Sequence, residues 1–344
     1  MASLITPDQF SANQDAEALR KACQGWGTNE KVIISILSHR SATQRKEIRV
    51  AYEQLYQEDL LKRLESELSG DFERAVYRWT LDPADRDAVL ANLAIKKPDE
   101  TDYNVIIEIS SVRCPEELLA VRKAYQLRYR CSLEEDLAQH TAGDIRKLLV
   151  ALVTAYRYDG NEINEKLASS EANILHDAIK EKCFNHEEII RILSTRSKTQ
   201  LMATFNKYRD DHGSSISKNL LGDGTSNFQK ALHVAIRCLN DPKKYFEKVV
   251  TKNSCVILSL LETIPSQTNI LSLIFCVKVL RNAIIGTGTD ENALTRVIVT
   301  RAERDLRDIM VVYYKKNSVP LEQAVAQETS GDYKTFLLTL LGKN

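Results

Sequence analysis

Apolar residues recur at helical spacing along most of the chain, and four of these stretches end in an arginine. The four stretches are Ile33–Arg40, Ile106–Arg113, Ile189–Arg196 and Leu294–Arg301. Each is followed by a polar break and then by a second helical pattern. Such self-similarity indicates an internal repeat of roughly 70–80 residues, longer than the common solenoid repeats. We therefore predict an all-α fold of four similar bundles, each of about four or five helices.

A small polar cap recurs in each bundle, ahead of an amphipathic helix rich in Leu, Ala and Val. The caps are Ser69–Phe72, Thr141–Asp144, Thr225–Phe228 and Ser330–Tyr333. Small polar residues favour helix N-termini because their side chains accept backbone hydrogen bonds. These marks divide the chain into an N-terminal segment and four repeats, at 1–12, 13–82, 83–158, 166–241 and 242–341.

A glycine loop and a distant acid occur twice with the same spacing. Gly25-Trp26-Gly27-Thr28 precedes Glu67, which follows Gly27 by 40 residues. Gly286-Thr287-Gly288-Thr289 precedes Glu328, which follows Gly288 by 40 residues. One such loop is a weak signal, but two copies with the same long interval predict a cation site closed by two distant parts of one repeat.

The repeat arginines align the middle repeats with these two. In repeat 2 the loop position holds Pro98–Thr101 and the acid position holds His140. In repeat 3 the loop position holds Glu181–Phe184, while the acid position keeps Asp223. The sequence therefore predicts complete sites in repeats 1 and 4 only.

Calcium is the ion that suits this pattern. It takes six to eight oxygen ligands from carboxylates, backbone carbonyls and water, and glycines with positive φ let a tight turn direct several carbonyls to one point. The predicted metal ligands are the carbonyls of Cys23, Gly25 and Gly27 with the Glu67 carboxylate, and those of Ile284, Gly286 and Gly288 with Glu328. Coordination positions left open can accept a lipid phosphate oxygen, so that the ion joins the protein to a membrane.

Trp26 stands between the two glycines of the first loop. The amphipathic ring of tryptophan suits the boundary between water and lipid. We predict that Trp26 contacts the membrane. The alternative is a loop tryptophan that packs on its own repeat.

Charge and cysteine content indicate which binding partners and which cellular compartment are expected. Lys+Arg and Asp+Glu are both 47, so no net basic field favours nucleic acid. The seven cysteines are scattered without a CxxC pair, which is typical of free thiols in a reducing cytosol. The sequence has no secretory signal and no uninterrupted apolar run of about 20 residues, so we expect a cytoplasmic protein without a transmembrane helix.

Four repeats, the GxGT loop and the acid 40 residues later resemble the annexins, and the plant type in particular. The likeness covers roughly Ala12 to Leu341. It implies four five-helix repeats in a curved disc, whose convex face binds calcium and docks reversibly on acidic phospholipids. It also implies recruitment to the plasma membrane or endomembranes when calcium rises.

The resemblance also brings alternatives of other classes. A peroxidase activity has been discussed for plant annexins, and His39 matches the histidine concerned; a helix-end histidine with local hydrogen bonds is the favoured interpretation. Nucleotide hydrolysis has been suggested too, but the chain has no GxxxxGK[ST] loop. Ile190–Ile192 matches a proposed actin-binding tripeptide, although apolar residues in a helix are more often core. We therefore favour a binding protein over an enzyme, with actin as a weaker partner.

The fourth repeat is too long for the pattern. Leu280–Ala283 matches Leu19–Ala22, and Tyr245–Val249 should run straight into it. Removing residues 250–279 restores the repeat spacing, so we predict an atypical insertion there that splits the first helix of repeat 4. Its two apolar runs around Pro265 favour sequence foreign to the repeat, such as a retained intron, over a membrane-inserting hairpin.

Overall fold

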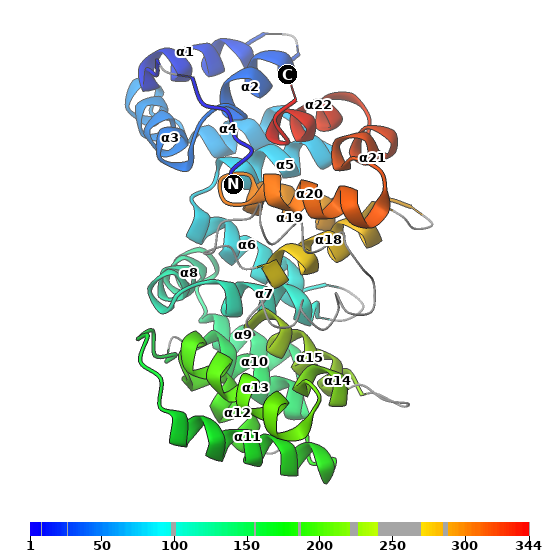
Figure 1. Cartoon of the computed structure of the whole chain (residues 1–344). Helices are drawn as coiled ribbons and strands as arrows, with labels where there is room; N and C mark the ends of the chain where they lie inside the picture. The colour runs from blue at the N-terminus through cyan, green and yellow to red at the C-terminus, as the bar shows by residue number, and fades with distance from the viewer. Residues whose placement is uncertain are drawn as a thin grey trace. The chain divides into compact units, whose positions relative to one another are not determined.

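The computed structural model describes residues 1–7, 9–25, 27–97, 101–154, 156–184, 187–220, 226–239, 270–284 and 288–343. Over these residues the regular structure is entirely α-helical, as predicted. The chain forms two compact units, Met1–Arg86 with Phe246–Asn344 and Asp87–Tyr245 (Figure 1). The first unit holds repeats 1 and 4, and the second holds repeats 2 and 3.

The described part of each repeat contains five helices. Those of repeats 1 and 4 are α1 (Ala12–Ala22), α2 (Glu30–Leu37), α3 (Ala42–Tyr56), α4 (Leu60–Glu67), α5 (Gly70–Thr80), α18 (Ile270–Ile284), α19 (Glu291–Arg301), α20 (Leu306–Asn317), α21 (Leu321–Glu328) and α22 (Gly331–Leu340). Those of repeats 2 and 3 are α6 (Pro83–Ile95), α7 (Tyr103–Val112), α8 (Pro115–Tyr129), α9 (Leu133–His140), α10 (Gly143–Val153), α11 (Glu165–Lys180), α12 (Glu187–Thr195), α13 (Lys198–His212), α14 (Ile216–Asn219) and α15 (Asn227–Leu239).

Short polar side chains cap the first four helices of repeat 1, whereas Ser69 makes no side-chain cap at α5. The Ser11 side chain caps α1, and Asn29 caps α2 by accepting from the Val32 amide. Ser41 and Gln44 form a capping box at α3, and Asp59 caps α4. These side chains satisfy amides that the first helical turn leaves without partners. The loops of the candidate site therefore lie between firmly terminated helices.

One apolar core joins repeats 1 and 4 in the first unit. Leu37 and Trp79 are fully buried there together with Val297 and Phe336. Helix α5 packs against α19 and α22, and the indole of Trp79 donates to the Leu37 carbonyl at 2.7 Å. Each such large apolar side chain stabilises the fold by about 1.5–3 kcal/mol. The helices that lead into the two candidate loops thus share one core.

Residues 270–279 differ from the expectation for the fourth repeat. They form the first two-thirds of α18, which runs unbroken to Ile284. Cys276 and Val277 are buried in the core that repeats 1 and 4 share. The last ten residues of the expected insertion, 270–279, therefore lie in a continuous helix with the residues that match the first helix of repeat 1. Residues 250–269 lie outside the described residues.

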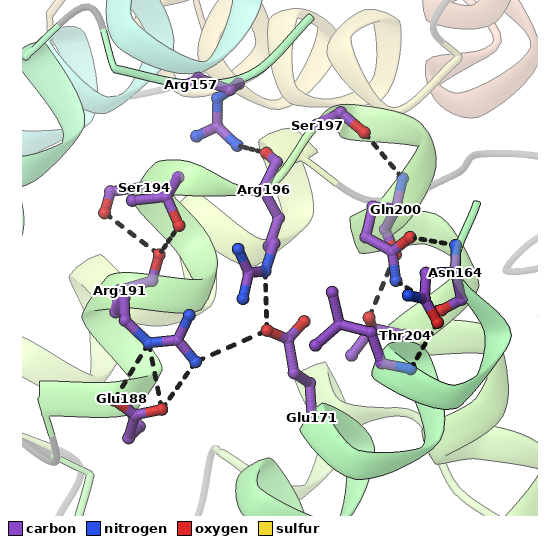
Figure 2. Close-up of polar contacts among 12 residues, drawn as sticks. Arg157, Asn164, Glu171, Glu188, Arg191, Ser194, Arg196, Ser197, Gln200 and Thr204 are labelled. Carbon is purple, nitrogen blue, oxygen red and sulfur yellow. Dashed lines mark hydrogen bonds and ion pairs between the residues drawn. The ribbon is translucent and has the colours of Figure 1, made fainter. Parts of the chain in front are cut away.

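Three of the repeat arginines bind an acid on the first helix of their own repeat. Arg40 contacts Asp15 at 2.6 Å, Arg113 contacts Asp87 at 2.5 Å and Arg196 contacts Glu171 at 2.7 Å. Figure 2 shows the repeat-3 pair, with Arg191 also reaching toward Glu171. In repeat 4, Arg301 instead binds Asp305 on the turn that follows it. The arginines are structural in all four repeats.

Candidate calcium sites

The first glycine loop leaves α1 at Cys23, whose amide closes the helix on the Leu19 and Arg20 carbonyls. Gly25 has φ +103° and Gly27 has φ +93°, a region that disfavours side chains. A Cβ at either glycine would meet nothing within 4 Å. Backbone conformation, not space, therefore demands both glycines. Trp26, between them, lies outside the described residues.

The structure brings this loop to the predicted acid. Glu67 is the last residue of α4, and its side chain is 22% exposed. The Thr28 hydroxyl lies 3.1 Å from Glu67 Oε2 and 3.4 Å from the Glu67 carbonyl. Behind it, the Asn29 amide donates to the Ala22 carbonyl at 2.8 Å and closes the loop. A carboxylate and a carbonyl-rich turn thus meet across 39 residues of sequence.

Arg63 connects the same two parts of the site. One nitrogen of its guanidinium, Nη2, lies 3.0 Å from Glu67 Oε1 and also donates to the Cys23 carbonyl. The Cys23 carbonyl therefore faces the end of α4, where Glu67 lies. The Cys23 carbonyl and the Glu67 carboxylate, both predicted calcium ligands, therefore bind the same guanidinium nitrogen of Arg63.

The Cys23 side chain has no part in ion binding as a thiolate. It is 1% exposed, and burial followed by the negative charge of Glu67 raises the pKa of its thiol to about 11. The thiol stays protonated at neutral pH. Cys23 can therefore offer a metal only its backbone carbonyl.

Repeat 4 repeats this geometry in its described part. Thr289 Oγ1 lies 3.4 Å from both Glu328 Oε2 and the Glu328 carbonyl, and the Asp290 amide donates to the Ala283 carbonyl at 2.9 Å. Ile284 ends α18 and is buried, as Cys23 is at the end of α1. Gly288 is described, whereas Gly286 lies outside the described residues.

Repeat 2 keeps the contact between the loop and the end of the fourth helix, but the acid position has no carboxylate. The Thr101 hydroxyl lies 3.4 Å from the His140 carbonyl, in the position that Thr28 and Thr289 take. The His140 ring turns back to Asp136, 2.9 Å from its carbonyl oxygen. In repeat 3, Lys182 takes a φ of +59° in the loop and Asp223 lies outside the described residues.

The donor set fits a hard cation held by main-chain oxygens and one carboxylate. Over the described residues, no group of three or more His, Cys, Asp or Glu side chains gathers as a metal centre. A hollow of about 370 Å³ lies between the two candidate sites. Six carboxylates line it: Glu30, Glu67, Asp71, Glu291, Glu328 and Asp332. The local field there attracts cations and repels anions.

The residues of the alternative functions have structural partners. His39 Nδ1 lies 3.0 Å from the Ser35 carbonyl, a local contact of the kind expected at a helix end. Ile190 and Ile192 are 8% and 0% exposed, so neither presents a surface to a partner. Between them, Arg191 binds Glu188 at 2.7 Å (Figure 2). The two isoleucines are therefore core residues, and only the Arg191 side chain, 38% exposed, reaches the surface.

Sequence reasoning missed Arg63 and the bond that Thr28 makes. The spacing of Arg63 and Glu67 is i,i+4 on one helix, which places two side chains on the same face. That spacing alone could have paired them, but it gave no sign that Arg63 also reaches Cys23, 40 residues earlier.

In the part of the chain that the structure describes, no helix is both long and apolar enough to cross a bilayer.

Comparisons with known proteins agree over the whole length. The family model described as Annexin matches residues 14–79, 86–152, 170–235 and 275–340. Annexin-like protein RJ4 of Fragaria ananassa is 75% identical over 343 residues, covering 100% of this chain and 99% of the relative. Annexin D7 of Arabidopsis thaliana is 49% identical over 343 residues, covering 99% of each chain.

Solved structures give the same result. Annexin III superposes with a TM-score of 0.83 at 31% identity, covering 100% of this chain and 97% of its own. Calcium-bound annexin (Sm)1 superposes with a TM-score of 0.79 at 28% identity, covering 100% and 93%. The fourth family match begins at residue 275, inside α18, in agreement with its role as the first helix of that repeat. This chain therefore belongs to the annexin family and is of the plant type.

Proposed function

We propose that this annexin binds Ca²⁺ at one site in repeat 1 and one in repeat 4, and through these ions docks reversibly on acidic phospholipid membranes. The observation that carries the proposal is the repeated link between loop and acid. Thr28 contacts Glu67 and Thr289 contacts Glu328, each on the same two oxygens of the acid residue.

Each site would combine three loop carbonyls with one carboxylate. In repeat 1 these are Cys23, Gly25 and Gly27 with Glu67; in repeat 4 they are Ile284, Gly286 and Gly288 with Glu328. Four protein residues leave part of the six to eight positions of Ca²⁺ to water or to phosphate oxygens. A lipid phosphate that enters such a position is held by the ion rather than by the protein.

Charge explains why the ion is needed. The protein carries no net charge, with 47 basic and 47 acidic residues. The hollow between the two sites is lined by six carboxylates and repels an anionic surface. Calcium bound at its two ends offsets most of that negative charge, so contact with acidic lipid follows calcium binding.

Trp26 would add an apolar contact between the first loop and the membrane. Its ring suits the headgroup region, and its neighbours Gly25 and Gly27 are the glycines of the site. The proposal describes a binding protein without catalysis, cytoplasmic at rest and peripheral at the plasma membrane or endomembranes when calcium is raised.

Vesicle sedimentation tests the proposal. The full chain should sediment with phosphatidylserine vesicles in calcium and remain in the supernatant with chelator, or with phosphatidylcholine vesicles alone. Sedimentation that does not depend on calcium, or its absence with phosphatidylserine, would rule out the proposed mode of binding.

A further inference from the structure

The two candidate sites differ at one position of the helix that carries the acid. Arg63 stands four residues before Glu67 in α4, and Ala324 stands four residues before Glu328 in α21. Both helices have eight residues and both end on the acid. The positions therefore correspond, and only repeat 1 has a cation there.

Arg63 binds atoms that the proposed site assigns to calcium. Its Nη2 lies 3.0 Å from Glu67 Oε1 and donates to the Cys23 carbonyl. The second carboxylate oxygen, Oε2, accepts from Thr28 at 3.1 Å. Calcium with a bidentate Glu67 would need both oxygens at about 2.3–2.6 Å. The guanidinium and the ion therefore require the same oxygens.

From this geometry we propose that Arg63 is an internal competitor for calcium, which weakens the repeat-1 site relative to the repeat-4 site. This inference rests on the proposed function. Ca²⁺ and the guanidinium would both lie between the Glu67 carboxylate and the Cys23 carbonyl, where their positive charges repel each other. Calcium therefore enters the repeat-1 site only when Arg63 leaves it. Repeat 4 has no such step at Ala324.

The structure offers Arg63 a second partner when it leaves. Glu58 Oε1 already lies 4.0 Å from Arg63 Nη1, its other oxygen Oε2 binds Arg20, and the side chain of Arg63 is 27% exposed. The guanidinium can turn to Glu58 by rotation of its own side chain, without a change in the backbone. Exchange between two carboxylates keeps the cost of displacement modest, so the effect on calcium affinity is a shift and not a block.

The test measures calcium binding without lipid, with Glu328→Gln as the background so that repeat 1 is observed. Tb³⁺ luminescence excited through tryptophan reports the ion, and Ca²⁺ displaces it in a titration. Arg63→Met keeps the length of the stem and removes the charge and the donors. Lys62→Met, an exposed neighbour, removes the same charge without touching the site.

Arg63→Met should tighten calcium binding about twofold to fivefold, the range that a partly exposed ion pair allows, and should enlarge the calcium-induced rise in Tm. Lys62→Met should change affinity less than about twofold. Unchanged or weaker binding in Arg63→Met would overturn the inference, as would an equal gain in Lys62→Met. Glu67→Gln in the same background separates the two proposals: if it leaves binding intact, the repeat-1 site itself is wrong.

Discussion

Replacing both Glu67 and Glu328 by glutamine is expected to abolish calcium-dependent sedimentation with phosphatidylserine vesicles. Each substitution removes the only carboxylate that the proposed site contributes, while leaving a side chain of the same shape. Loss of an outer partner of a metal ligand already costs about 10–100-fold in affinity, so loss of the charged ligand itself should cost about 100-fold or more per site. The calcium concentration for half-maximal sedimentation measures this.

The single variants and a matched control define this experiment. Glu67→Gln and Glu328→Gln alone should each shift the calcium requirement without abolishing binding, because the other site remains. Glu65→Gln with Glu322→Gln removes the same charge from the same two helices, α4 and α21, and should behave like the unaltered protein. A double variant at 67 and 328 that still sediments with calcium would show that the ligands lie elsewhere.

Arg113→Met should lower the free energy of unfolding by about 3–5 kcal/mol. Arg113 and Asp87 form a pair at 2.5 Å with side chains 7% and 2% exposed, so the substitution leaves a buried carboxylate without its counter-ion. Removing one partner of a buried pair costs far more than the pair contributes. Urea unfolding followed by circular dichroism measures the loss.

An exposed pair supplies the comparison. Arg191 and Glu188 lie 2.7 Å apart with side chains 38% and 37% exposed, and Arg191→Met should cost at most about 1 kcal/mol. Replacing both partners, Asp87→Leu with Arg113→Met, should recover much of the loss. If Arg113→Met costs no more than Arg191→Met, the repeat arginine does not stabilise its bundle in the way described.

The sequence was sufficient for the repeat and for the link between loop and acid. The arginine spacing aligned each loop with its acid position, and the structure brings these two parts together in repeats 1, 2 and 4, through threonine contacts that the sequence did not predict. The separation between the threonine and the acid position is 39 residues in all three repeats, so aligning the repeats was enough to find the link.

Two features of repeat 4, the partner of Arg301 and the first helix, could not be predicted in this way because they depart from the pattern of the other repeats. Arg40, Arg113 and Arg196 bind acids 25 or 26 residues earlier. The corresponding residue for Arg301 is Cys276, and the acid is Asp305 instead. Residues 270–279 likewise lack the repeat pattern but have the apolar character that a buried first helix needs. The core accommodates a different apolar sequence at this helix, which the pattern of the other three repeats does not predict.

Calcium titration of the intact chain with and without phosphatidylserine vesicles tests the central claim most directly. If the ion joins protein to lipid, the vesicles must raise calcium affinity by the same factor by which calcium raises lipid affinity. We expect the titration to shift to lower calcium by about tenfold or more when the vesicles are present, and to shift little with phosphatidylcholine. Calcium binding of equal affinity in all three conditions would contradict the account.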